Sequence, residues 1–270
     1  MVKIKPFRAI RPSSYNVDHV ASPFYDVLSL EEAREIAYSN PKSFLHVERA
    51  EVSLAEQFVD DREKIFKQAK ENLLTFIENK WLIQDHKEAY YLYRLHRENE
   101  YQYGLVATIA VDEYEKGNIA YEEPPEFERK FDVTGYLESS GAHTSPVILS
   151  SPRNEKLDQL LANFRATKFP VYMFESEDEE DDSNHCVWMI KEESLVKEIT
   201  RIFQEEIGGL SIISGRHLFE SAKEVAERRK EANLNANPNA EYNFFLGIIH
   251  ANTDELVTWP LSGLFIHAFE

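Results

Sequence analysis

The sequence predicts an α+β fold with mixed, largely antiparallel sheets and packed helices. Runs of β-forming residues come in hairpin-like pairs, at 90–95 with 101–111 and at 171–174 with 185–190. Amphipathic helical segments separate these pairs, but they do not alternate with single strands in a regular βαβ rhythm. Hairpins imply antiparallel pairing, and irregular mixing of strands and helices is typical of the α+β class.

The two hairpins differ in the segment that joins their strands. The first pair of runs flanks the polar Arg97-Glu98-Asn99-Glu100, a short connection. The second flanks 175–182, which is almost entirely acidic. A calcium loop would need the glycine and spaced ligands of an EF-hand, which this segment lacks. It is therefore interpreted as a solvated hairpin tip held open by charge repulsion, and its role stays undefined.

Helix signals precede and follow the first hairpin. Ser29 with Glu32 forms a capping box, and the helix that it opens ends at Asn40-Pro41. A second helix follows Asp60-Asp61, because apolar residues recur there at helical spacing. These residues are Ile65, Phe66, Ala69, Leu73, Phe76 and Ile77. The segment Phe44-Leu45-His46-Val47 is predicted to be a short strand.

Length and composition favour one globular unit. The chain has 270 residues, of which 43% are hydrophobic, enough for a sizeable core. We expect a single domain over 1–270, with a soft internal boundary near 150. No apolar run of membrane-spanning length and no secretory leader occurs, and Cys186 is the single cysteine. These features predict a soluble protein of the reducing cytoplasm, with no membrane partner and with Cys186 in the core.

The formal net charge of −18 limits the partners. A field of that sign repels phosphate backbones, so DNA is a disfavoured partner. A local basic pocket can still bind one small anion. The sequence leaves the oligomeric state open.

One such pocket is predicted at Ser214-Gly215-Arg216-His217, between a strand at 210–213 and a helix at 217–230. A strand that ends in glycine and opens a helix directs backbone N–H groups at an incoming phosphate. Gly215 permits close backbone approach, Arg216 can clamp an anion, and His217 can transfer a proton. Ser214 can cap the helix. An ordinary strand–turn–helix junction is the alternative.

Three further basic residues and one carboxylate are candidates. Arg8, His46 and Arg49 could complete the phosphate pocket, or they could pair on the surface with neighbouring glutamates such as Glu48 or Glu51. Asp26 could serve as a general base or metal carboxylate, or it could cap its own turn.

Several segments, spread over nearly the whole chain, resemble the domain-of-unknown-function family 1015. They are Ile4-Lys5-Pro6-Phe7-Arg8-Ala9, Val20-Ala21-Ser22-Pro23-Phe24-Tyr25-Asp26-Val27, Asn40-Pro41-Lys42-Ser43-Phe44-Leu45-His46-Val47 with Arg49, Tyr103-Gly104-Leu105-Val106, Ala142-His143-Thr144-Ser145-Pro146-Val147 and Tyr242-Asn243-Phe244-Phe245-Leu246. The resemblance implies a ParB/sulfiredoxin-like element around 200–260, a fold whose relatives bind nucleotides and in some cases transfer phosphate.

The chain departs from the family pattern where catalysis is expected. An Asp-Gly-His-His-Arg hallmark of the family aligns with 214–218, where Gly215 and His217 are kept. The aspartate is Ser214, the first histidine is Arg216 and the arginine is Leu218. A family His-Glu pair aligns with Tyr121-Glu122, so only its glutamate is kept.

Two functions follow from the resemblance. The first is an enzyme that binds a nucleotide or phosphorylated small molecule and transfers or hydrolyses phosphate, with ATP or another nucleotide and Mg²⁺ as the implied cofactors. Ser214, Gly215 and Arg216 would hold the phosphate, while His217, Glu122 or Asp26 would handle protons; no protein metal site is assigned. The alternative is a divergent, non-catalytic member that binds a ligand or a protein.

Overall fold

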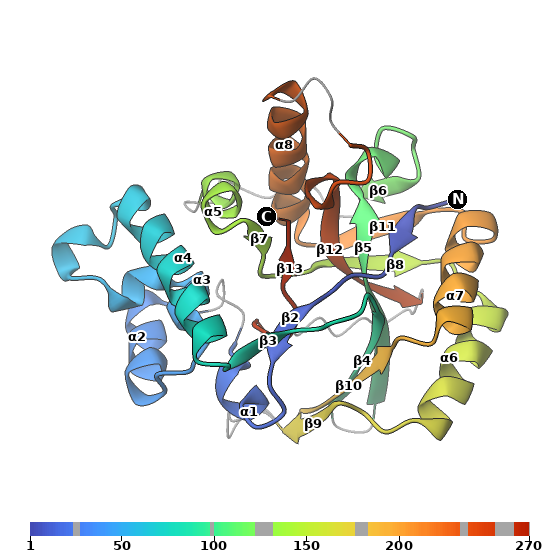
Figure 1. The fold of residues 1–270 in the computed structure, drawn as a ribbon, viewed down its shortest axis with the longest axis horizontal. Coiled ribbons are helices and arrows are strands. Elements are labelled where there is room, and N and C mark those ends of the chain that lie inside the picture. Colours follow the sequence, from blue (N-terminus) through green and yellow to red (C-terminus); the bar gives the residue numbers. More distant parts are fainter. Residues whose placement is uncertain are drawn as a thin grey trace.

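The protein is an α+β structure built around one large mixed sheet (Figure 1). It is a computed structural model that describes residues 1–23, 28–97, 100–121, 132–175, 183–232, 237–251 and 262–269. Within these residues the main sheet has nine strands, in the order β6-β11-β8-β12-β5-β4-β10-β9, with β1 also paired to β5. The predicted α+β class is confirmed.

Most strand pairs in this sheet are antiparallel. Parallel pairing occurs between β6 and β11 and between β8 and β12. The strands are β1 (Ile4–Lys5), β4 (Tyr90–Arg97), β5 (Glu100–Ala110), β6 (Ile119–Tyr121), β8 (Val147–Ser151), β9 (Tyr172–Glu175), β10 (Asn184–Ile190), β11 (Leu210–Ser214) and β12 (Phe244–Ala251). Both predicted hairpins, β4–β5 and β9–β10, are present.

Helices surround the sheet (Figure 1). The α-helices are α1 (Val17–Val20), α2 (Leu30–Ser39), α3 (Leu45–Glu48), α4 (Arg62–Glu78), α5 (Val133–Ser140), α6 (Glu155–Thr167), α7 (Glu193–Glu205) and α8 (Arg216–Ala232). Short 3-10 turns occur at Ala50–Ser53, Glu56–Phe58, Val111–Glu113 and Glu241–Asn243. Two small sheets pair β2 (Ile10–Pro12) with β3 (Leu82–Gln84) and β7 (Ala142–His143) with β13 (His267–Ala268).

Each face of the main sheet buries its own apolar core. Alternate residues of a strand point to opposite faces, so Phe245 joins one core and Leu246 the other. The first core contains apolar side chains of α6, α7 and α8, and the second contains the N-terminal Phe7 and the C-terminal Phe265. Residues on both sides of position 150 contribute to the sheet, and the division of the chain into domains remains a prediction.

A helical layer lies beside the sheet and is built by α2 to α5 (Figure 1). The predicted capping box of α2 is present, since Ser29 accepts from the Glu32 amide and Glu32 accepts from the Ser29 amide. Helix α4 begins after Asp61, and Ile65, Ala69, Leu73 and Phe76 are buried along it as predicted.

The prediction of a strand at 44–47 was wrong. This run lies mostly within α3, where the amides of Val47 and Glu48 donate to the carbonyl of Phe44. Phe44, Leu45 and Val47 are all inaccessible, whereas His46 between them is partly exposed. A run of four residues is too short to show a period, so it cannot distinguish a buried strand from a buried helical turn.

A buried ion pair joins β2 to Asp85, the residue that directly follows β3. Arg11 donates from Nε and Nη2 to the two carboxylate oxygens of Asp85, at 2.7 and 2.8 Å. Tyr91 donates to the same carboxylate at 2.6 Å, and Nη1 of Arg11 donates to Tyr172 at 2.5 Å. The charges are therefore fully paired, which marks Arg11 as a structural residue.

No helix among the described residues is both long enough and apolar enough to cross a membrane.

Candidate functional site

The predicted strand–turn–helix junction is present at 210–217. Strand β11 ends at Ser214, Gly215 adopts a left-handed conformation with φ of 82°, and α8 begins at Arg216. The Gly215 carbonyl accepts from the amides of Leu218 and Phe219, at 2.9 and 3.1 Å. The amides of Arg216 and His217 therefore precede the first hydrogen bond within the helix, the position that suits an anion.

Gly215 packs against the strand segment that follows Ser145. A Cβ atom at Gly215 would lie 3.4 Å from the Cα atom of Val147 and 3.7 Å from the carbonyl oxygen of Pro146. It would also lie 3.3 Å from Cδ1 of Leu218. Close approach and a positive φ together explain why glycine stands here.

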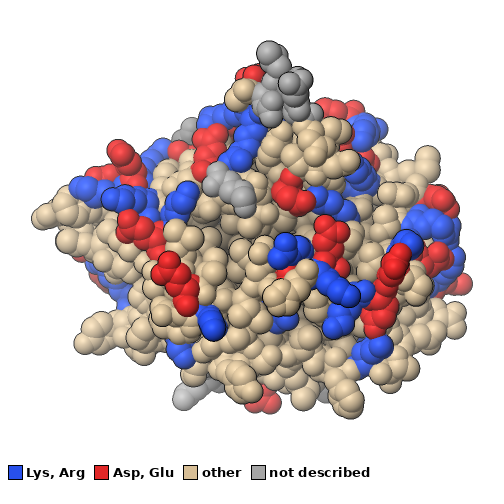
Figure 2. Space-filling view, viewed as in Figure 1, with Lys and Arg blue, Asp and Glu red and all other residues tan. Residues whose placement is uncertain are grey.

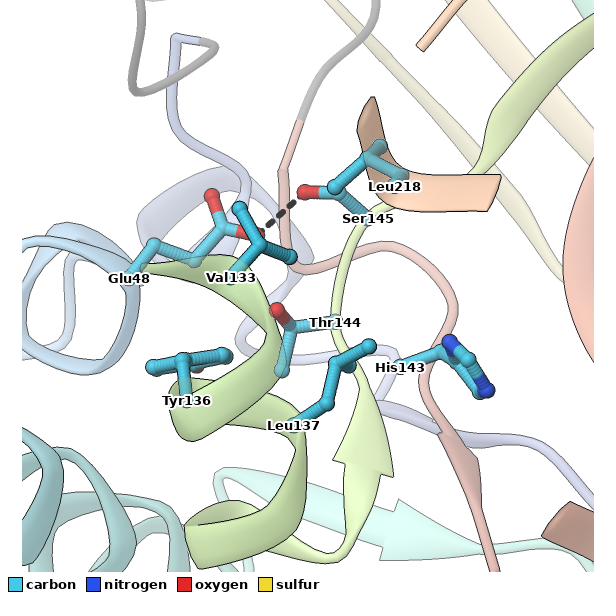
Figure 3. A pocket seen from close by; sticks show the side chains of 8 residues that line it. All are labelled: Glu48, Val133, Tyr136, Leu137, His143, Thr144, Ser145 and Leu218. Atoms are coloured by element: carbon cyan, nitrogen blue, oxygen red, sulfur yellow. Dashed lines mark hydrogen bonds between the residues drawn. The ribbon is translucent and has the colours of Figure 1, made fainter. Parts of the chain in front are cut away.

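A small cavity lies beside this junction (Figure 3). Its volume is about 20 Å³, which is room for about one water molecule. The lining residues come from α3, α5, the start of α8 and the segment after β7. They are Glu48, Val133, Tyr136, Leu137, His143, Thr144, Ser145 and Leu218. The cavity thus joins the 40–49, 142–147 and 214–218 segments, which are far apart in the sequence.

Glu48 and Ser145 face each other in this cavity, as Figure 3 shows. The Ser145 hydroxyl donates to Oε1 of Glu48, and both residues are buried, with 6% and 4% exposure. Tyr136 lies in the same wall, where burial and the negative charge of Glu48 raise the pKa of its hydroxyl. Among the described residues that line this cavity, Glu48 supplies the carboxylate. A carboxylate in this position can accept a proton from a water molecule or a hydroxyl group.

The ring of His143 points away from Glu48 (Figure 3) and stacks on His267, with ring centroids 5.6 Å apart. Burial lowers the pKa of both rings, and the neighbouring His267 lowers that of His143 further. Glu241 accepts from Nε2 of His267 at 2.8 Å and from Lys5 at 2.7 Å. Both histidines are therefore neutral at neutral pH, so they add no positive charge to this end of the molecule.

Arg216 and His217 begin α8 beside the cavity, and they do not line it. The guanidinium of Arg216 lies 4.0 Å from the centroid of the Tyr121 ring, and its Nε donates to Glu220 at 2.7 Å. The Nδ1 atom of His217 is buried. Leu218, which stands where the family pattern has arginine, is 8% exposed and forms part of the cavity wall.

The other predicted basic residues contact different parts of the chain. Arg8 is exposed and donates to the carbonyl of Asp85 at 2.9 Å. His46, on α3, contacts the Ala37 carbonyl and the Ser53 hydroxyl, each at 3.0 Å. Arg49 pairs with Glu51 at 2.6 Å and donates to the Leu28 carbonyl at 2.9 Å. None of these contacts joins Arg8, His46 or Arg49 to the α8 junction, and their role in phosphate binding stays a prediction.

Asp26 and Glu122 lie outside the described residues. Arg216, at the start of α8, lies over the ring of Tyr121. Tyr121 is the last residue of β6 and directly precedes Glu122 in the sequence. Glu48 was predicted only as a surface partner of nearby basic residues, and no role was predicted for Ser145. Their positions in the sequence could have indicated a role for both residues, since each lies in or directly beside a segment that resembles the family.

The charges on the visible face of the molecule are mixed. Figure 2 shows Lys and Arg side chains interspersed with Asp and Glu on the described part of this face, with no continuous basic stripe. Among the described residues, no group of three or more His, Cys, Asp or Glu side chains is arranged to hold a metal ion.

The fold and the junction define an α+β protein with one strand–glycine–helix turn beside a buried carboxylate. Comparison with protein families gives a match over residues 4–262 to the family described as "Protein of unknown function (DUF1015)". The match covers nearly the whole chain, and the chain belongs to this family. No curated protein and no solved structure gives a significant match.

Proposed function

We propose that this chain binds a small phosphorylated ligand or a nucleotide at the α8 junction, and that Glu48 assists transfer or hydrolysis of its phosphate. The observation that carries this proposal is the placement of the Gly215 turn against Pro146-Val147, beside the cavity that holds Glu48 and Ser145. A helix start suits an anion, and a buried carboxylate suits a proton acceptor. The two features together fit a phosphate-handling site.

The size of the cavity indicates that the attacking water and the phosphate would bind at different places. About 20 Å³ excludes a nucleotide but admits one water or one hydroxyl group. The phosphate would lie outside, against the amides of Arg216 and His217. An oxygen of water or an alcohol would attack phosphorus as the bond to the leaving group breaks, and its proton would pass to Glu48. Ser145 would hold the carboxylate in place through the hydrogen bond that it donates.

Arg216 would hold the phosphate from the side of β6. Its guanidinium stacks on Tyr121, and this contact holds it near the start of α8. Its ion-pair partner, Glu220, has a side chain that is 51% exposed. An exposed ion pair contributes little stability, so a phosphate could replace Glu220 at small cost. Mg²⁺ would arrive with the nucleotide and take its ligands mainly from phosphate and water. His217, Glu122 and Asp26 remain the proposed residues for further proton transfer.

The second candidate is a family member that binds such a ligand without turnover. Leu218 favours it, because an apolar side chain lines the cavity where the family pattern has an arginine. The developing charge on a transferred phosphate would then lack one cation. Binding without turnover distinguishes this candidate from the first.

DNA remains a disfavoured partner in this proposal, because the net charge of −18 repels phosphate backbones. The cytoplasm is the proposed compartment, and the single buried cysteine, Cys186, supports it.

The proposal is tested by thermal shift with ATP, ADP, CTP and GTP, each with and without Mg²⁺. A ligand at a hundredfold excess over its dissociation constant stabilises the fold by about 2.7 kcal/mol. We expect one nucleotide to raise Tm, and Arg216→Ala to abolish the shift. Arg153→Ala, which removes an exposed arginine at the far end of β8, serves as the control and should keep it.

Turnover is then measured by phosphate release with wild type and Glu48→Gln. The glutamine keeps the size of the side chain and an oxygen for Ser145, but it cannot take up a proton. Loss of turnover with binding intact supports the enzyme, and binding with no turnover in wild type supports the second candidate. The absence of any Tm shift with a folded sample would overturn both.

A further inference from the structure

A large open groove lies at the opposite end of β8 from the cavity. Its volume is about 1040 Å³. It runs between α6 and strand β5, and the last residues of the parallel strands β8 and β12, Ser151 and Ala251, both line it. Ligands of open sheets commonly bind outside the carboxyl ends of parallel strands. The groove shares no lining residue with the cavity at Glu48.

Arg165 of α6 lies in this groove over an aromatic ring. Its guanidinium carbon is 4.1 Å from the centroid of the Tyr103 ring. Among the described residues it has no carboxylate partner, although the chain has 48 acidic and only 30 basic residues. A planar guanidinium held on a ring, with its hydrogen-bond donors unused by a carboxylate, is well placed to bind an anion.

A second arginine, for which the described residues supply no carboxylate partner, lies next to the groove without lining it. Arg94 is the cross-strand neighbour of Tyr103, so the two side chains share a face of the sheet. Its guanidinium lies 5.3 Å from the centroid of the Tyr101 ring, and its Nη2 donates to the Asn184 side chain at 2.7 Å. Its Nε atom is buried with no hydrogen-bond partner. Two arginines therefore flank Tyr101 and Tyr103.

Tyr101 adds an exposed aromatic surface to the groove. It is 57% exposed, and its ring stacks on His96 with centroids 4.2 Å apart, which fixes its orientation. A large aromatic side chain held rigidly at the surface is typical of a ligand contact, because little rotational freedom is lost on binding.

Among the described residues, the carboxylates that line the groove form no ion pair with Arg165 or Arg94. Asp158 pairs with the exposed Arg153 at 2.8 Å, and Glu100 and Glu155 are exposed. His250 also lines the groove, and its Nδ1 donates to the Tyr103 carbonyl at 3.0 Å. Arg165 is thus the arginine of the groove that no carboxylate among the described residues pairs with.

We propose that this groove is a second binding site, for a small organic anion that carries a flat aromatic or heterocyclic ring. The anionic group binds Arg165, with Arg94 beside it, and the ring stacks against Tyr101. The site does not depend on the α8 junction, because it lies at the other end of β8 and uses different residues.

The test uses 2-naphthoate as the probe and calorimetry on the full chain. Two comparison compounds separate the contributions: 2-naphthamide has the ring without the charge, and cyclohexanecarboxylate has the charge without the ring. We expect 2-naphthoate to bind wild type, and each comparison compound to bind at least tenfold more weakly. Arg165→Gln should weaken 2-naphthoate at least tenfold.

Arg153→Gln is the matched control, because it removes an arginine of the same groove that already has a carboxylate partner. It should leave the Kd for 2-naphthoate within about twofold. Arg165→Lys, which keeps the charge and loses the planar group, should give an intermediate Kd. Failure of 2-naphthoate to bind folded wild type at millimolar concentration, or equal binding by Arg165→Gln, would overturn the proposal. Neither result depends on whether nucleotides bind at α8.

Discussion

The two ends of strand β8 present opposite kinds of polar site. At the amino end, Glu48 and Ser145 are buried and joined by a hydrogen bond, beside a cavity that admits about one water molecule. At the carboxyl end, Arg165 and Tyr101 lie in an open groove of about 1040 Å³, and Arg165 has no carboxylate partner among the described residues. One strand therefore separates a small pocket from a large groove.

Because of this difference, a substitution at one site should change the stability of the fold, and a substitution at the other should change ligand binding. A buried polar group that is paired contributes to the folded state, so its loss is measured as stability. An exposed group that lacks a partner contributes little to folding, so its loss is measured as binding. Stability measurements can therefore separate the two kinds of site.

The largest loss in the free energy of unfolding is expected for a substitution of Asp85. This residue belongs to a buried ion pair, with which the exposed ion pairs can be compared. Asp85→Ala leaves the Arg11 guanidinium buried without its carboxylate, and we expect a loss of about 3–5 kcal/mol in the free energy of unfolding. Urea denaturation measures it. Asp158→Ala removes the partner of the exposed Arg153 and should cost less than about 1 kcal/mol. Equal losses would contradict the distinction between buried and exposed pairs.

The second effect depends on pH and arises at the groove end. Burial lowers the pKa of His250 to about 4, below its usual value near 6.5. Between these values the unfolded chain binds a proton that the folded chain does not, so stability falls as pH falls from about 6.5 to 4. With about 1.36 kcal/mol for each unit, the contribution is roughly 3 kcal/mol.

His250→Gln isolates this contribution. The glutamine amide can still donate to the Tyr103 carbonyl but does not titrate. Chemical denaturation at pH 7 and at pH 4 should show that the variant loses roughly 2–3 kcal/mol less stability than wild type over this interval. The same loss in both proteins would show that the neutral ring of His250 is not what makes the fold sensitive to acid.

The third effect concerns the α8 junction. Gly215→Ala places a Cβ at positive φ and against Val147, whereas Gly117→Ala meets the same backbone penalty with nothing within 4 Å. The left-handed conformation costs an alanine about 1–2 kcal/mol at either position. We expect Gly215→Ala to lose more than Gly117→Ala in thermal unfolding. The reverse order would show that the junction does not pack tightly on the segment after Ser145.

The smallest effect on stability is expected at Arg165. Arg165→Gln removes one contact with the Tyr103 ring and should change the free energy of unfolding by less than about 1 kcal/mol. The same variant should lose most of its affinity for 2-naphthoate. A large loss of stability in urea would indicate that Arg165 holds α6 on the sheet and is not reserved for a ligand.

Local signals in the sequence predicted much of the fold. The capping box of α2, the buried face of α4 and the β4–β5 hairpin each depend on residues a few positions apart. The junction at Gly215 was also predicted, because a strand, a glycine and a helix follow one another directly. Local spacing carries this information, since capping and periodicity act within one or two turns.

The contacts that define the candidate site could not be predicted in this way. Glu48 and Ser145 are 97 positions apart, and their hydrogen bond exists because α3 and the segment after β7 meet beside α8. The order of strands in the sheet, in which β8 lies between β11 and β12, is likewise set by long-range packing. Arg165 and Tyr103 meet for the same reason, across α6 and β5.

The most direct measurement of the central claim is an amide-resolved NMR titration with the nucleotide that raises Tm most. The account predicts shifts of the backbone amides of Gly215, Arg216, His217 and Leu218. Shifts confined to the groove residues, or none at 215–218 on saturation, would contradict a phosphate site at the start of α8.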